Sequence, residues 1–442
     1  MDKCILVSLA FLASSSAWSQ AAPAATGAAE EQDVTSMHTP PWAGEAMFSS
    51  ERSGEDRTNL LRVVVTAAPA YNDNVLPYQS EPPVSDSSFT YSSTVSFDRS
   101  RPRLRAMFSY TPQVTVYRRS SVLNNLSHDF SGELSLRTSR HATVTLRESF
   151  DKSTGVFGPS FASWSQSAGG ALAASQGAIA PWASQMHSSS SGDIVYQYSR
   201  SRMIGASGAA TQLIYMDGGG GEGLCDANSR SGSGFYNIRL TPGTYAGASY
   251  GYATYGSCSG VMRNGTETHT IDLFFSYYSR NGISLSISGG PQRYTADMTS
   301  LPSPHQWTPN AAGNIAWQGN WARFTAAFSR TVAGAGGLVG SYRTLEADSD
   351  IRIQMTRSWS AAAAVTYQQQ KNVNPQAPAS IPGGHSLLST LSLGRSFAER
   401  IRAELQYQRI HQSYGTLAPQ AVPNANRISI ALSYRFERPL GR

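Results

Sequence analysis

The chain has 442 residues and a formal net charge of +6, yet only 14% of its residues are charged and only 40% are hydrophobic. A soluble protein normally carries about 25% charged residues, so this composition argues against an ordinary soluble globular protein. The 39 glycines and 21 tyrosines, with abundant serine, are typical of many strands that bury one face in something other than a protein core.

The first twenty residues, MDKCILVSLAFLASSSAWSQ, predict a secretory signal peptide. Lys3 precedes a short apolar run over residues 4–13, and the small-residue pattern AWS follows at 17–19. Such a segment is too short to span a bilayer, so we expect cleavage between Ser19 and Gln20, with residues 1–19 removed. The alternative is a buried N-terminal strand or helix. No later apolar run reaches the roughly 18 residues of a transmembrane helix.

Residues 20–60 differ from everything that follows. They are rich in Ala and Pro, show no hydrophobic period, and carry seven acidic residues against Arg52 and Arg57, a formal charge of −5. This composition is typical of a disordered or loosely docked segment, here in the periplasm. Residues 61–442 therefore carry about +11 and form the folded domain.

From residue 61 onward, apolar and polar residues alternate with a period of two. The stretch AERIRAELQYQR (398–409) consists of good helix formers, but a strand would place on one face Ile401, Ala403, Leu405 and Tyr407. The same alternation recurs in FTYSSTVSFD (89–98), TLEADSDIRIQMT (344–356) and ANRISIALSYRFE (425–437). A period of two sustained in segment after segment identifies strands, so we read 398–409 as a strand too.

Short polar turns and longer links alternate strictly between these strands. Short turns are predicted near residues 100–102, 139–140, 200–201, 242–243, 281–282, 319–320, 357–358 and 398–399. Longer links are predicted near 77–86, 119–125, 153–186, 218–228, 259–265, 296–307, 334–340, 372–383 and 414–424. This rhythm predicts a single all-β, transmembrane antiparallel β-barrel of about 18 strands, with 16 as the alternative count. A soluble propeller or sandwich stack is the other interpretation, but it would repeat a recognisable motif in each blade.

The first predicted strand carries a resemblance to a known group. RVVVTAAPAYNDNV (62–75) resembles the first strand of β-barrel porins of Gram-negative bacteria, which ends in an aromatic residue followed by Asp/Asn and Asn-Val. Here those positions are Tyr71, Asn72, Asp73, Asn74 and Val75. The segments 110–117 and 128–150 resemble the next strands, and ISIALSYRF (428–436) looks like a closing strand, although ERPLGR follows where many such chains stop. The resemblance lies in strand style over 61–436. It implies a pore in the cell outer membrane, in some members encoded beside polysaccharide-secretion genes.

Charged residues recur on the polar faces of the strands, which alternation assigns to the water-filled side. The pore-lining candidates are Arg105, Glu133, Arg147, Arg323, Glu346, Asp348, Asp350, Arg352, Arg402, Glu404 and Arg435. Both signs of charge are present, and the arginine excess leaves an anion preference open. Further arginines fall in the short turns, where they would meet anionic lipid headgroups.

The third long link, 153–186, contains no charged side chain between Ser153 and Met186. A loop exposed to water would usually carry charge, so this one is a candidate for folding into the lumen as a constriction. Its aromatic residues would then offer faces along which sugars slide: Phe157, Phe161, Trp164 and Trp182. The alternative is an ordinary surface loop.

Cys225 and Cys258 are the two cysteines that remain after signal cleavage, and both fall on the side of the long links. An oxidising compartment and an even count favour a disulfide that ties neighbouring loops, with two free thiols as the alternative.

The sequence offers little catalytic chemistry. The eight histidines show no pair with metal-ligand spacing, and no G-x-S-x-G stands at a strand-to-helix turn. His141 and His269 lie on strands with serine nearby, but serine is so abundant in this chain that the proximity carries little weight. We therefore expect no enzyme, no metal and no cofactor. Export excludes a nucleic-acid partner for the basic charge.

The leading functional hypothesis is a porin-like channel for passive diffusion of small polar or sugar solutes through an outer membrane, with membrane lipid as its other partner. The first alternative is the exit barrel of a polysaccharide-secretion system, which would need polysaccharide-export partners. The second is a structural or adhesion barrel with a plugged lumen.

Overall fold

The computed structural model describes Met37 and residues 59–75, 83–154, 184–216, 226–257, 264–279, 281–298, 305–335, 338–373, 383–414 and 424–440. These residues form eighteen strands and one short 3-10 helix, η2 (Ser121–Leu123). The strands are β1 (Leu60–Asn72), β2 (Asp86–Arg101), β3 (Leu104–Tyr117), β4 (Asn125–Arg137), β5 (Ala142–Thr154), β6 (Ser184–Ser199), β7 (Arg202–Tyr215), β8 (Ala227–Thr241), β9 (Thr244–Ser257), β10 (Asn264–Tyr278), β11 (Ile283–Met298), β12 (His305–Gln318), β13 (Ala322–Ala335), β14 (Leu338–Gln354), β15 (Trp359–Asn372), β16 (Gly384–Ala398), β17 (Ile401–Tyr414) and β18 (Asn424–Pro439).

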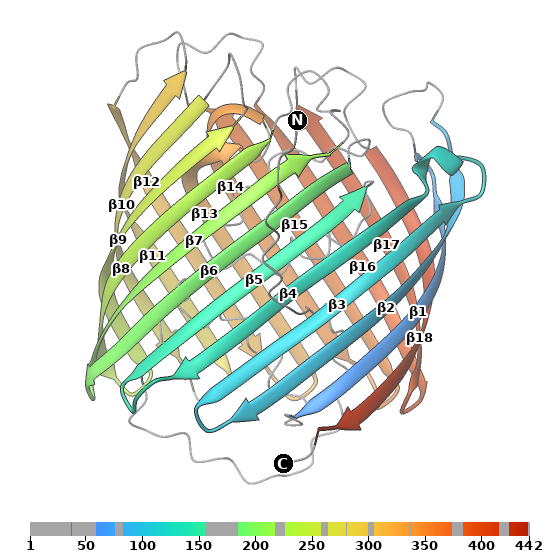
Figure 1. Cartoon of the computed structure of the whole chain (residues 1–442), viewed down its shortest axis with the longest axis horizontal. Helices are drawn as coiled ribbons and strands as arrows, with labels where there is room; N and C mark the ends of the chain where they lie inside the picture. The colour runs from blue at the N-terminus through green and yellow to red at the C-terminus, as the bar shows by residue number, and fades with distance from the viewer. Residues whose placement is uncertain are drawn as a thin grey trace, which may run out of the picture.

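The strands form one closed antiparallel barrel. Each strand pairs with the next along the chain, and β18 pairs with β1 to close the sheet, as the red and blue strands side by side in Figure 1 show. The predicted all-β barrel of about 18 strands is confirmed, and 401–414 is a strand. No helix in the described part of the chain is long and apolar enough to cross a membrane.

The two faces of the barrel wall differ as the alternation requires. On β18, Ile430 and Leu432 are each more than half exposed on the outside, whereas Ser429 on the opposite face is buried. In lipid every backbone polar group must be paired within the protein, and a closed sheet does this without free edges. An apolar outer face around a polar interior is the architecture of outer-membrane barrels, and this barrel belongs in the outer membrane.

The predicted turns lie between the strands where the sequence placed them. At the turn between β10 and β11, Gly282 has φ 76°, and an added Cβ would lie 2.2 Å from the carbonyl oxygen of Gln318, so only glycine fits. The long link predicted at 334–340 is wrong. There β13 continues to Ala335 and β14 begins at Leu338, because both strands extend into a hairpin that leaves the wall.

The seam between the first and last strands is pinned at both ends. At the end with the short turns, Glu437 accepts a hydrogen bond from Arg62 at 2.9 Å, and the backbone N of Leu440 donates to the Asn59 carbonyl oxygen at 2.8 Å. At the other end, the backbone N of Asn426 donates to Asp73 at 2.7 Å. The residues after Phe436 therefore continue β18 to Pro439. Asp73, which belongs to the pattern at the end of the first strand, holds the other end of β18 through Asn426.

Candidate functional site: the charged lumen

All the predicted pore-lining residues lie on the luminal face. On β5, for example, Arg147 shares its face with buried Thr145, whereas Leu146 is half exposed on the outside. Cross-strand register places the others on the same side of the wall, since directly paired residues share a face. Pairs such as Arg323 with Arg352 and Glu133 with Arg147 therefore face the lumen together.

Arginines form a ring at the mouth on the side of the short turns, which in an outer-membrane barrel faces the periplasm. We call this set the arginine ring: Arg105, Arg239, Arg323, Arg352, Arg402 and Arg435. Five of these arginines lie within three residues of a short turn, and the backbone N of Arg435 donates to the carbonyl oxygen of Arg400 in a turn. Carboxylates lie farther from the turns on the same luminal face, among them Asp98, Glu133, Asp350 and Glu404. Charge in the lumen is thus layered along the pore axis.

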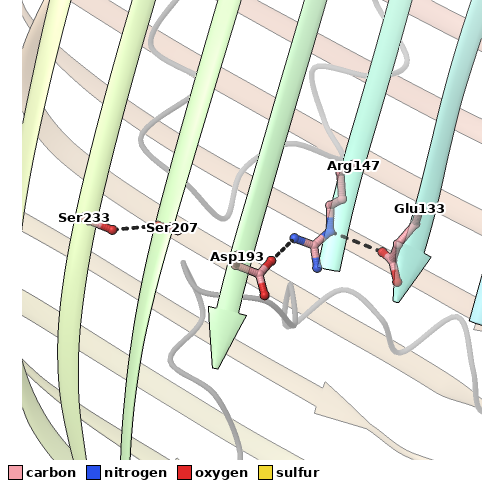
Figure 2. Close-up of polar contacts among 5 residues, drawn as sticks. All are labelled: Glu133, Arg147, Asp193, Ser207 and Ser233. Atoms are coloured by element: carbon pink, nitrogen blue, oxygen red, sulfur yellow. Dashed lines mark hydrogen bonds and ion pairs between the residues drawn. The ribbon is translucent and has the colours of Figure 1, made fainter. Parts of the chain in front are cut away.

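Arg147 joins two carboxylates across three strands. Its Nε donates to Glu133 on β4 at 3.3 Å, and its Nη1 donates to Asp193 on β6 at 2.7 Å, as Figure 2 shows. Ser207 and Ser233 share a hydrogen bond of 2.7 Å on the neighbouring strands. One guanidinium between two carboxylates leaves a net negative charge on this part of the wall.

Arg402 on β17 forms a second network, with side chains of β15 and β17. Its Nη2 donates to Ser360 at 3.0 Å and to Glu404 at 3.3 Å. To reach Ser360 on β15, the side chain crosses β16 over Gly394, where an added Cβ would lie 2.3 Å from Nη2. Arg352 and Asp350 pair at 3.3 Å on β14.

Glu346 and Asp348 differ from Asp350 and Glu404, which pair with arginines. They stand two residues apart on β14, and within the described residues neither has a cationic partner at ion-pair distance. Both lie farther from the periplasmic turn than Asp350. The lumen beyond the arginine ring therefore carries acidic side chains that no arginine pairs with, although the chain as a whole is basic.

The outer half of the lumen is narrowed by the β13–β14 hairpin. Pairing between β12 and β13 stops at Ala311 and Arg330, and the rest of β13 turns inward. Ser341 then shares a hydrogen bond with Thr266 of β10, and Gly334 approaches Tyr255 of β9 so closely that an added Cβ would lie 2.7 Å from the Tyr255 Cβ.

We define the hairpin end as residues 331–335 and 338–344. The burial of side chains in it and on the facing wall agrees with its position inside the barrel. Val332 and Tyr342 are fully buried, and so, within a few per cent, are Gln292 and Tyr294 on the luminal face of β11. The hairpin end lies against the luminal wall of β9, β10 and β11 and fills part of the passage.

Sequence reasoning missed this constriction and proposed another. The sequence predicts a longer link at 334–340, but the absence of charge over 331–335 and the glycine at 334 are the signal that could have identified a segment packed in close contact. The predicted constriction loop lies outside the described residues over 155–183, with Phe157, Phe161, Trp164 and Trp182, and so do Cys225 and Cys258 and the cleavage site at Ser19 and Gln20. Their roles stay predictions.

Among the described residues, no group of His, Cys, Asp and Glu side chains could hold a metal ion. No family model matches the chain, and no curated protein matches it in sequence.

Solved structures with a similar fold are outer-membrane proteins. OccK2 (OpdF) of Pseudomonas aeruginosa aligns with a TM-score of 0.40 and 7% identity over 86% of this chain and 98% of its own. The outer membrane protein opdK of the same organism aligns with a TM-score of 0.40 and 10% identity over 86% and 99%. The FrpB iron transporter of Neisseria meningitidis (F5-1 variant, apoprotein form) aligns with a TM-score of 0.43 and 11% identity over 88% and 68%. Likeness at this level concerns the fold alone.

Proposed function

We propose that the barrel is a passive channel through which small polar solutes diffuse across the outer membrane. The observation that carries this proposal is the luminal face of an eighteen-strand barrel, which presents hydroxyls, amides and ion pairs such as Arg147 with Asp193. Closed barrels of about 16–18 strands leave room for an aqueous channel, and polar groups on its wall keep it wet.

The charge layering supports a preference for neutral and cationic solutes over anions. A solute that enters from outside passes Glu346 and Asp348 before it reaches the arginine ring. Ionised carboxylates without an arginine partner in a narrow, low-dielectric passage raise the local concentration of cations. The ring arginines Arg352 and Arg402 are paired with carboxylates, which weakens their attraction for anions.

Liposome swelling tests the proposal. Liposomes that contain the chain without residues 21–58 report on the barrel alone, and we expect uptake of arabinose, slower uptake of a disaccharide and none of a large dextran. Empty liposomes provide the baseline. Folded barrel that gives no swelling above this baseline with any sugar would refute a diffusion channel.

A further inference from the structure

A polar strip runs along the luminal wall of β14 and β15, beyond the arginine ring. Three cross-strand pairs form this strip: Asp348 with Thr366, Glu346 with Gln368, and Thr344 with Gln370. Directly paired residues share a face, and successive pairs on one face lie about 7 Å apart along the strands. Asp348 is half-buried, whereas the other five side chains are at most 9% exposed. The strip therefore leads from a side chain open to the lumen to enclosed ones.

The two carboxyl groups of the polar strip act as a pair. The side chains of Glu346 and Asp348 are hydrogen-bonded to each other, and Asp348 is also bonded to Thr366. Two carboxyl groups share a hydrogen bond only when one of them holds a proton, so the pair carries a single negative charge. Oδ1 of Asp348 has no hydrogen-bond partner among the described residues. The pair therefore offers acceptor oxygens to a cation with one positive charge.

The enclosed end of the polar strip holds polar groups that nothing bonds. Gln370 is fully buried, and in the part of the chain that the structure describes neither Oε1 nor Nε2 of its amide has a hydrogen-bond partner. Thr344, its cross-strand partner, is 1% exposed, and its Oγ1 is unpartnered as well. Buried side-chain polar groups are nearly always bonded in native proteins, and those that are not need an explanation. Here they point to a polar ligand on the same face as the carboxyl pair.

The two ends of the strip suit different groups of one solute. A primary ammonium supplies three N–H donors and one positive charge to the carboxyl pair. A hydroxyl both donates and accepts, so it can bond to either atom of the Gln370 amide and to the Thr344 hydroxyl. Glu346 and Thr344 occupy successive luminal positions, about 7 Å apart along β14. A flexible chain of a few carbons between ammonium and hydroxyl spans that distance.

Simpler solutes satisfy only one end. A bare inorganic cation compensates the charge of Glu346 and Asp348, but it gives the Nε2 of Gln370 no acceptor. A neutral sugar bonds to Gln370 and leaves the charge of the carboxyl pair uncompensated. A solute that carries both groups completes the bonding of the whole strip.

We propose that the polar strip is a binding site for a small hydroxylated ammonium ion, such as an amino polyol. Its ammonium lies at Glu346 and Asp348, and its hydroxyls bond to Gln370 and Thr344. This inference rests on the proposed channel function for the passage of the solute, whereas binding requires only that the solute reaches the lumen.

Block of the potassium current through the full chain in planar bilayers tests the site. Glucamine, added to KCl at neutral pH, should reduce the single-channel current with a saturating dose dependence. Sorbitol, which has the same carbon chain with a hydroxyl in place of the ammonium, should have little effect. Tetramethylammonium has the charge without an N–H donor and should block only at several-fold higher concentration. Equal block by glucamine and tetramethylammonium would overturn the site.

Gln370→Leu separates binding in the strip from attraction by charge alone. The substitution replaces unpartnered polar atoms by an apolar group of similar size, so the barrel should still fold. The half-blocking concentration should rise several-fold for glucamine and less for tetramethylammonium, because only glucamine has hydroxyls that lose a partner. Gln113→Leu, at a luminal position of β3, is the matched control. Identical glucamine block in the wild type and in Gln370→Leu would overturn the proposal.

Saturation-transfer NMR in detergent micelles reads binding without any current. Saturation of the wild-type protein should pass to the glucamine protons, and much less should pass in Glu346→Gln with Asp348→Asn. Binding to a barrel that carries no current would retain the site and refute the channel. Conversely, current through a barrel whose glucamine signals equal those of the double variant would refute the site and retain the channel.

Discussion

The side-chain amide of Gln292 forms a hydrogen bond with each polar group of the Val332 backbone. Its Nε2 donates to the Val332 carbonyl oxygen at 3.0 Å, and its Oε1 accepts from the Val332 backbone N at 2.8 Å. Val332 lies just beyond the point where β13 loses its pairing with β12, so a glutamine on β11 replaces the missing strand. A buried backbone without such a partner would be costly, and Gln292 therefore allows the β13–β14 hairpin to leave the wall and narrow the lumen.

Gln292→Leu should release this hairpin end. It leaves the buried Val332 backbone N–H without a partner, at a cost of about 1–3 kcal/mol, and removes the shorter of the two hydrogen bonds to the Val332 carbonyl oxygen. The hairpin should then move toward the wall. We expect higher single-channel conductance in the chain without residues 21–58, which reports on the barrel alone. Gln406→Leu, at a luminal position of β17, is the matched control. Unchanged conductance for Gln292→Leu would place the hairpin outside the path of the ions.

Neutralising Glu346 and Asp348 should shift ion selectivity. Glu346→Gln with Asp348→Asn removes luminal carboxylates that have no cationic partner, and we expect the cation-to-anion permeability ratio from reversal potentials to fall roughly twofold. Glu148→Gln on the outer face of β5 removes one carboxylate outside the pore and should leave the reversal potential unaltered. An equal shift from both changes would contradict a luminal role for the β14 pair.

Gly205→Ala should destabilise the barrel, because its Cβ would meet the Phe235 ring at 2.4 Å and the Ile194 carbonyl oxygen at 2.9 Å. Overpacking of this kind costs about 1–3 kcal/mol. Gly208→Ala on the same strand is the control, since its nearest neighbour would be 3.7 Å away. Urea unfolding in detergent micelles measures the difference, and equal midpoints for the two variants would show that the Phe235 ring does not need Gly205.

Glu437→Gln should weaken the barrel seam. Glu437 pairs with Arg62 at 2.9 Å and with Arg435 at 3.4 Å, and these side chains are 17–20% exposed. Each partly exposed pair contributes about 1 kcal/mol or less, so we expect a loss of roughly 1–2 kcal/mol in the same unfolding assay. Glu399→Gln in a short turn is the control. A double-mutant cycle with Arg62→Met should show coupling, and strict additivity would mean that the pair does not stabilise the seam.

Strand positions, turns and the luminal faces could be predicted because each follows from a local period of two. The choice between helix and strand for residues 398–409 follows in the same way, from the repetition of that period elsewhere in the chain. The hairpin could not be predicted, since the end of β12–β13 pairing depends on Gln292, a residue distant in the sequence. The buried apolar cluster of Val195, Met203, Phe235 and Phe274 has one member on each of four strands, which gives no pattern along the chain. The net positive charge of the whole chain is also a poor guide to the charge of the lumen. Asp350 and Glu404 pair with arginines, whereas Glu346 and Asp348 do not.

The most direct test of the central claim, that the lumen is an aqueous passage, is the single-channel conductance of the chain without residues 21–58. We expect discrete, ohmic current steps whose size rises in proportion to salt concentration, from protein that shows heat-modifiable migration on gels. The same folded protein, inserted in the bilayer and protected from protease, without current steps at any salt concentration would contradict the claim.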